Sequence, residues 1–166
     1  KEQEISIILK KQEQIIIENN ADLNSCKQII ETKNRTLWSR EINDDDFTNV
    51  RLGIGDRPAY ITIEAPEDKF TLDDDNLYQM VVSLRKKYST LHNVPITTSF
   101  KEEIVTALIL TGAQKDYMIN SIMLQLITYH SPLDLKVVVI TNKENEDRWE
   151  YVKYLQHCWN DEKTVR

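Results

Sequence analysis

Two nearly continuous apolar runs constrain this sequence more than any other feature. Residues 104–111 read Ile-Val-Thr-Ala-Leu-Ile-Leu-Thr, and residues 135–141 read Leu-Lys-Val-Val-Val-Ile-Thr. Such runs are typical of strands that are buried on both faces of a parallel sheet. The segment 114–129 between them has helical periodicity, and His130-Ser131-Pro132 ends that helix. This order of strand, helix and strand predicts parallel pairing through a right-handed crossover.

The rest of the chain predicts further alternating elements. Period-two patterns indicate strands at 50–54 and 60–64, joined by a turn at 55–58. Short strands are also expected at 95–99 and from 164 onward. A helix is expected over 72–88, with its first turn capped by Asp73, Asp74 and Asp75, and another over 145–155. We therefore predict an α/β protein with a mainly parallel sheet flanked by helices.

The N-terminal 33 residues contain neither glycine nor proline and carry a helical stripe. Leu9, Ile16, Leu23 and Ile30 recur every seven residues, while Asn19-Asn20 weakens the helix at its centre. Two interpretations stay open: an amphipathic helix packed on its own domain, or a stalk or coiled-coil arm reaching away from it. In either case a partner is needed for the extra isoleucines, which are Ile7, Ile8, Ile15 and Ile17. We divide the chain into this arm, residues 1–36, and an α/β domain, residues 37–166.

Composition excludes several classes of function. A net charge of −6 and a pI near 5.1 argue against binding to nucleic acid, whose phosphates an acidic surface repels. Cys26 and Cys158 stand alone and the three histidines are scattered, so we expect inert, buried thiols in a reducing cytosol and no metal site. No apolar run is long enough to span a membrane. The chain starts within a charged helical pattern and lacks an initiator methionine, which suggests a fragment of a longer protein.

The turn after the first apolar run is where a nucleotide would bind in an α/β fold of this kind. The chain has only three glycines, so neither a Walker A loop nor a G-x-G-x-x-G turn is intact. The turn offers Gly112, Ala113, Gln114, Lys115 and Asp116, without a hydroxyl residue after the lysine. The second run ends in Thr141-Asn142 rather than in an acid that could hold magnesium. We expect no hydrolysis here, and the simplest interpretation makes Lys115 and Asp116 solvated residues of a first helical turn.

Other candidate residues have plain structural interpretations. His130 is expected to end its helix and to be stabilised by the helix dipole rather than to act as a general base. Trp149 and Trp159, near Tyr151 and Tyr154, are expected to be core or edge aromatics, and a protein-contact patch is the alternative. No catalytic constellation assembles, so no catalytic residue is predicted.

Several motifs nevertheless resemble one protein family over residues 37–166. They are Leu37-Trp38-Ser39-Arg40, Asp46-Phe47, Val50-Arg51-Leu52-Gly53-Ile54-Gly55, Gln125-Leu126, Tyr129-His130-Ser131-Pro132-Leu133-Asp134-Leu135-Lys136, Glu146-Asp147-Arg148-Trp149 and Lys153-Tyr154-Leu155-Gln156-His157. The sequence thereby resembles a cytosolic domain of the FtsK/SpoIIIE-like ATPases of type VII secretion, the EssC/EccC group. Tyr154 and Gln156 depart from the tryptophan and proline usual in the last of these motifs.

The resemblance implies a degenerate P-loop-NTPase-like domain between a membrane segment and further ATPase domains, with residues 1–33 as the stalk. It places the chain at the cytoplasmic face of a bacterial membrane, among membrane components of the secretion apparatus, later ATPase domains and other copies of itself, as in a hexamer. ATP and magnesium are expected in those later domains, and none in this one. We expect a coupling role without ATP hydrolysis. A weak ATPase or nucleotide sensor, or a plain α/β interaction module, are the alternatives.

Overall fold

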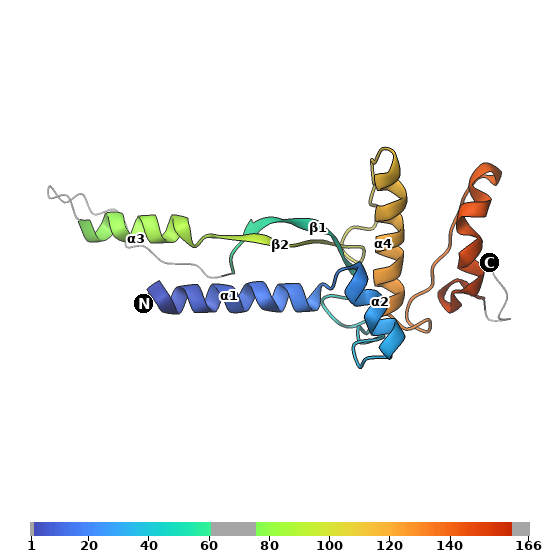
Figure 1. Ribbon diagram of the computed structural model, residues 1–166, viewed down its shortest axis with the longest axis horizontal. Helices are drawn as coiled ribbons and strands as arrows, with labels where there is room; N and C mark the ends of the chain where they lie inside the picture. The colour runs from blue at the N-terminus through green and yellow to red at the C-terminus, as the bar shows by residue number, and fades with distance from the viewer. Residues whose placement is uncertain (1, 61–75, 161–166) are drawn as a thin grey trace. The chain divides into compact units, whose positions relative to one another are not determined.

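The computed structural model describes residues 2–60 and 76–160 (Figure 1). The chain divides into two compact units. Unit 1 comprises Lys1–Ala21 and Arg51–Thr97, and unit 2 comprises Asp22–Val50 and Thr98–Arg166. Among the helices of the described ranges, none has the length and apolar character needed to cross a bilayer.

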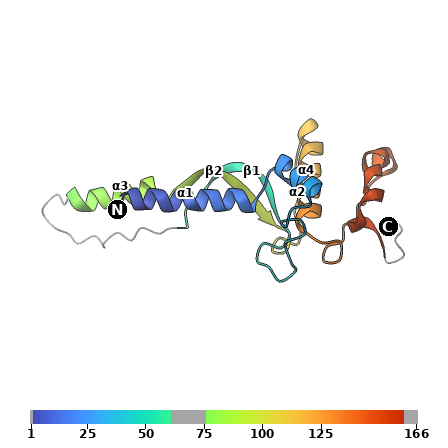
Figure 2. The ribbon, with the colours of Figure 1, turned by 60° about the horizontal axis from the view of Figure 1, so that its bottom comes forward.

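Unit 1 is built on a two-stranded ribbon. Strands β1 (Asn49–Pro58) and β2 (Thr90–Ser99) pair with each other, and helices α1 (Glu2–Asn19) and α3 (Asn76–Lys87) accompany them. The Ala59 N–H donates to the Ser89 carbonyl beyond one end of the ribbon, so the end of β1 meets the start of β2 and the strands are antiparallel. Helix α1 lies alongside the ribbon in both views (Figures 1 and 2).

The heptad stripe of α1 packs inside unit 1. Leu9 and Ile16 are buried and form a core with Leu91 and Val94 of β2. The residues packed around this core are Ile5, Ala59 and Tyr88, while Ile7, Ile8, Ile15 and Ile17 stay exposed. Helix α1 is therefore an amphipathic helix packed on its own unit, the first of the two interpretations. The division at residue 36 stays a prediction.

The weakness predicted at Asn19-Asn20 takes the form of a break between α1 and the next helix, and unit 2 begins just after it. Helix α2 (Leu23–Thr32) starts at Asp22, whose side chain accepts a hydrogen bond from the Ser25 N–H at 2.8 Å. It packs against α4 (Ala113–Tyr129), which ends at His130 as predicted. Cys26 is buried in this unit, as is Cys158 at the far end, which confirms the prediction of buried thiols.

The α/β class is confirmed, but the structure does not form the predicted parallel sheet. Residues 104–111 and 135–141 belong to no strand, and the sheet of the described residues is the antiparallel pair β1–β2. Many of their apolar side chains are open to solvent, with Ile104 92%, Ile109 94% and Ile140 95% exposed. A strand is stable only beside a partner that takes its backbone hydrogen bonds, so apolar composition alone does not produce one.

Several element boundaries also differ from the prediction. The turn expected at 55–58 is wrong, because β1 runs through it to Pro58, and β2 begins earlier than 95, at Thr90. The expected helix at 145–155 is confirmed as η1 (Lys143–Tyr154), a 3-10 helix followed by the short η2 (Gln156–Cys158). The helix predicted at 72–88 is confirmed as α3. Its cap at 73–75 and the strands at 60–64 and 164–166 fall wholly or mostly outside the described residues.

The packing of α1 is testable by one pair of substitutions. Leu9→Ala should lower the free energy of unfolding by about 2–5 kcal/mol, because it empties a buried site. Ile7→Ala, on the exposed side of the same helix, should change it by less than about 0.5 kcal/mol. Urea unfolding followed by circular dichroism measures both. Equal, small effects would show that α1 does not pack on the ribbon.

Candidate functional site

The turn Gly112–Asp116 lies at the N-terminus of α4, as predicted. Gly112 has φ +61° and ψ −144°, a conformation that is essentially restricted to glycine. A Cβ at this position would meet no atom within 4 Å, so backbone geometry rather than crowding requires the glycine. Gln114, Lys115 and Asp116 are exposed. Lys115 and Asp116 are thus residues of an open first turn of the helix.

A cavity of about 400 Å³ adjoins this turn. Its lining includes Lys115 and Asp116 from α4, Thr141 at the end of the second apolar run, and Arg148 and Trp149 from η1. Arg148 forms an ion pair with Asp116 at 3.4 Å, so two of the charges lining the cavity neutralise each other. Lys115 remains as the cation that an anionic ligand could use, and no hydroxyl side chain follows it.

The wall of this cavity is aromatic and polar. The Tyr151 hydroxyl donates to the Asn120 side-chain oxygen at 3.1 Å, and Trp149 lies 6.1 Å from Tyr151, centroid to centroid. Burial raises the pKa of Tyr151, so its hydroxyl stays a neutral donor. Such a wall can stack on a flat ligand or a peptide side chain, but it supplies no group that activates water. No cluster of three or more metal-ligating side chains occurs within the described ranges.

The motifs at 37–47 and 129–132 meet at the other end of α4. The last carbonyls of a helix lack partners within the helix, and here residues 38–40 provide them. The Trp38 N–H donates to Thr128 O at 2.8 Å and its indole N–H to Ile127 O at 3.2 Å. The Arg40 N–H donates to Tyr129 O at 3.0 Å. We call this contact between residues 38–40 and the end of α4 the α4 cap.

A buried arginine reinforces the α4 cap. Arg40 is only 5% exposed, and its Nε lies 2.9 Å from a carboxylate oxygen of Asp46. Its Nη1 donates to Asn49 O at 2.6 Å, and its guanidinium lies 4.1 Å from the centre of the Tyr129 ring. The positive charge stands beside a helix C-terminus, where the dipole favours it. Sequence reasoning placed these residues in motifs but had no signal that joined Arg40 to Tyr129.

His130 is fully buried and connects three segments. Its Nδ1–H donates to Leu126 O at 2.8 Å, which leaves Nε2 to accept the Thr48 N–H at 3.0 Å. Its carbonyl accepts a hydrogen bond from His157 Nε2 at 2.8 Å. Because both ring nitrogens of His130 are engaged in this way, the neutral tautomer fits the site.

The environment of the two histidines opposes their protonation. Burial lowers the pKa of His130, and the nearby Arg40 charge lowers it further, although the bond to Leu126 O acts in the opposite direction. Burial also lowers the pKa of His157. His130 does end α4, but the expected stabilisation of its charge by the helix dipole is outweighed by desolvation.

Thr48 holds a strained backbone against His130. Its φ of +59° is rare for a β-branched residue, and conformations of this kind persist only where the surroundings over-determine them. Here the Thr48 N–H is bonded to His130, and its carbonyl accepts from the Phe100 N–H at 3.3 Å. The Phe47 ring packs edge-on against His130 at 4.9 Å.

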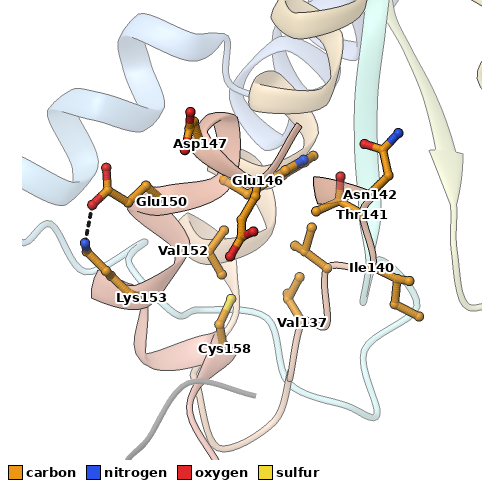
Figure 3. A pocket seen from close by; sticks show the side chains of 12 residues that line it. Val137, Ile140, Thr141, Asn142, Glu146, Asp147, Glu150, Val152, Lys153 and Cys158 are labelled. Atoms are coloured by element: carbon orange, nitrogen blue, oxygen red, sulfur yellow. Dashed lines mark hydrogen bonds and ion pairs between the residues drawn. The ribbon is translucent and has the colours of Figure 1, made fainter. Parts of the chain in front are cut away.

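A second, larger cavity of about 750 Å³ lies between residues 137–142 and η1 (Figure 3). Val152 and Cys158, which line it, are buried, whereas Ile140 is exposed. Burial raises the pKa of the Cys158 thiol, so the thiolate is disfavoured and the residue is unreactive. Sequence reasoning did not predict this cavity, because it arises where the second apolar run stays unpaired.

Comparison with known proteins gives relatives from bacterial secretion systems. The ESX secretion system protein EccC of Thermomonospora curvata is 27% identical over 124 residues, which cover 73% of this chain and 9% of that protein. The ESX secretion system protein YukB of Bacillus subtilis is 24% identical over 156 residues, 93% of this chain and 10% of that protein. The type VII secretion system protein EssC of Staphylococcus aureus is 21% identical over 159 residues, 95% of this chain and 10% of that protein. No family model matches the chain.

These relatives are all named as proteins of bacterial secretion systems. The resemblance indicated by the motifs is confirmed, because the chain is similar to EccC, YukB and EssC proteins over most of its length. It spans about a tenth of the length of the curated relatives that it matches.

The importance of the α4 cap can be measured by removing its charge. Arg40→Met should cost about 1.5–3 kcal/mol of unfolding free energy, because Asp46 and the Asn49 carbonyl lose a charged donor. Arg35→Met replaces an exposed arginine of the same segment and should be nearly neutral. Urea unfolding monitored by tryptophan fluorescence compares them. Equal midpoints would mean that the Arg40 contacts do not contribute to stability.

The buried histidines predict a direction for pH dependence. The folded-state pKa values of His130 and His157 lie below the ordinary value of 6.5. Unfolding therefore takes up protons, and stability is complete above about pH 7 and falls as the pH drops below 6.5 toward the folded-state values. Urea midpoints at several pH values between about 7.5 and 5 measure the slope. The double variant His130→Gln/His157→Gln should flatten it, while His92→Gln, at an exposed position in unit 1, should not. A slope that survives the double variant would contradict this assignment.

Proposed function

We propose that this chain is a coupling segment of a type VII secretion motor and does not itself hydrolyse ATP. Its relationship to EccC and EssC proteins supports the placement in such a motor. The observation that best supports the second part of the proposal, the lack of ATP hydrolysis, is the Asp116–Arg148 ion pair. It puts a carboxylate at the N-terminus of α4 and occupies the nearest arginine, at the point where a nucleotide-hydrolysing site needs free positive charge.

The way in which the chain divides supports a coupling role. It passes between unit 1 and unit 2 three times, at residues 21–22, 50–51 and 97–98. Two of these passages lie inside the paired strands β1 and β2. A hydrogen-bonded ribbon resists extension better than a loop does, so it suits the transmission of force. In this proposal the partners are membrane components of the secretion apparatus, later ATPase domains and other copies of the chain, at the cytoplasmic face of the membrane.

The finer fold implied by the family remains part of the proposal. In a degenerate P-loop-like domain, residues 104–111 and 135–141 would be parallel strands of one sheet, joined by α4 but not necessarily adjacent to each other. Both runs lie outside the strands of the described residues, and the 17 residues of α4 suit a crossover between them. Pairing would cover side chains such as Ile104 and Ile109, which are otherwise exposed.

A weak ATPase or nucleotide sensor is the second candidate. It is favoured by the cavity beside Gly112–Asp116, whose lining combines Lys115 with Trp149 and Asn120. Lysine can pair with a phosphate, and an aromatic ring can stack on a base. The two candidates differ in whether nucleotide binds at all.

Calorimetry separates these candidates. We expect no saturable heat when ATP and magnesium are titrated into the chain up to millimolar nucleotide, because Asp116 occupies Arg148 and leaves Lys115 as the one cation of the described cavity lining that faces the phosphates. In the whole secretion protein, Lys115→Ala should leave export unchanged, as should Lys143→Ala, which removes an exposed lysine outside the cavity lining. A saturable signal that Lys115→Ala abolishes and Lys143→Ala retains would overturn the coupling-only proposal in favour of a nucleotide sensor.

A further inference from the structure

The larger cavity is an open groove with an extended chain as one wall. Val137, Ile140 and Thr141 lie across from Val152 and Cys158 (Figure 3). Helix η1, the opposite wall, is a 3-10 helix of 12 residues. Runs of 3-10 helix longer than three or four residues are uncommon, because their side chains stack in poorly packed rows. The floor of the groove is apolar, and the side chains of η1 leave the space above it unfilled.

The extended wall has the properties of a strand without a neighbour. Its burial alternates, with Leu135, Val137 and Val139 half-buried and Lys136, Val138 and Ile140 exposed. The Val137 N–H donates to His157 O at 2.9 Å, but among the described residues no hydrogen bond involves 138–141. These β-branched residues favour extended backbone, so the segment is poised to accept a strand.

The charged residues that line the groove favour a positively charged ligand. Glu146 projects between η1 and the extended wall, and Asp147 and Glu150 also line the cavity (Figure 3). Lys153, the one cation in the lining, is paired with Glu150. No ion pair is present for Glu146 or Asp147 within the described part of the chain. The groove is thus acidic above an apolar floor.

We propose that the groove between residues 137–142 and η1 binds an extended, basic peptide segment by strand addition. The backbone of the segment pairs with residues 138–141, its apolar side chains cover Ile140 and enter the floor, and a lysine or arginine reaches Glu146. Main-chain bonds supply affinity in this mode of recognition, and alternate side chains supply specificity. The groove shares Ile140, Thr141 and Trp149 with the cavity beside the Gly112–Asp116 turn, but Lys115 and Asp116 do not line it, so the proposal does not depend on whether nucleotide binds at that turn.

Charge complementarity distinguishes this occupant from two others. A second copy of the chain carries a net charge of −6 and is repelled by an acidic groove. The chain's own residues 104–111 are apolar but contain no basic residue, so they would leave Glu146 without a partner. A basic strand would supply hydrogen bonds to the backbone of residues 138–141, apolar side chains to the floor of the groove and positive charge to its carboxylates.

Fluorescence anisotropy of a labelled nine-residue peptide of alternating valine and lysine tests the proposal on the full chain. We expect saturable binding that weakens by about tenfold or more when salt is raised, because the attraction is screened. A valine–glutamate peptide should not bind. The valine–lysine peptide with a central proline should bind at least about tenfold more weakly, because proline interrupts main-chain pairing. Equal binding of the proline peptide would reduce the interaction to non-specific charge attraction and overturn the proposal.

Matched variants locate the site. Glu146→Gln should weaken binding severalfold, whereas Glu144→Gln, on the same helix but outside the lining, should not. Ile140→Lys should abolish binding, and Ile109→Lys, an equally exposed change in the other run, should leave it intact. No binding to the unmodified chain, together with binding to Ile109→Lys, would identify residues 104–111 as the occupant and overturn the proposal. Self-association that Ile140→Lys abolishes would do the same in favour of a second copy.

Discussion

The free carbonyl groups at the end of α4 are the constraint on which unit 2 depends. Helix α4 is mostly buried in its second half, so its last carbonyls cannot all turn to water. Trp38 and Arg40 donate to Ile127, Thr128 and Tyr129, and this contact joins segments almost 90 residues apart in the sequence. The Arg40 charge then stabilises the same helix end, held by Asp46 on one side and the Tyr129 ring on the other.

The α4 cap also explains the strained start of β1. His130 lies just after the capped carbonyls, and its neutral ring accepts the N–H of Thr48 in a conformation that threonine rarely adopts. A protonated His130 would have two donors and no acceptor for that N–H. The strain at Thr48, the burial of Arg40 and the neutral state of His130 are therefore consequences of one arrangement. The motifs that revealed the family relationship are largely the parts of this arrangement.

Features set by local sequence could be predicted, and features set by distant contacts could not. The break at Asn19-Asn20, the extent of α4 and its end at His130 follow from propensity and periodicity over a few residues. The α4 cap could not be found in this way, because nothing in Trp38-Ser39-Arg40 specifies which helix it will meet. The same holds for the candidate site. Its turn was placed correctly from sequence, but the Asp116–Arg148 pair joins residues 32 positions apart, and the groove depends on which strands find partners.

The two apolar runs also show that distant contacts cannot be predicted from local sequence, because here a clear local pattern did not lead to the predicted sheet. Their composition fits buried strands. Composition determines only the tendency of a segment to form a strand, however, and it does not determine which other strand pairs with it. In the structure α4 is complete and capped, while residues 104–111 and 135–141 on either side of it belong to no strand. Of the two cations that the described residues place near the turn, Arg148 is already held by Asp116, which leaves only Lys115. What unit 2 leaves unsatisfied is therefore extended backbone, exposed isoleucine and carboxylate, and these groups suit the recognition of a polypeptide strand better than that of a phosphate.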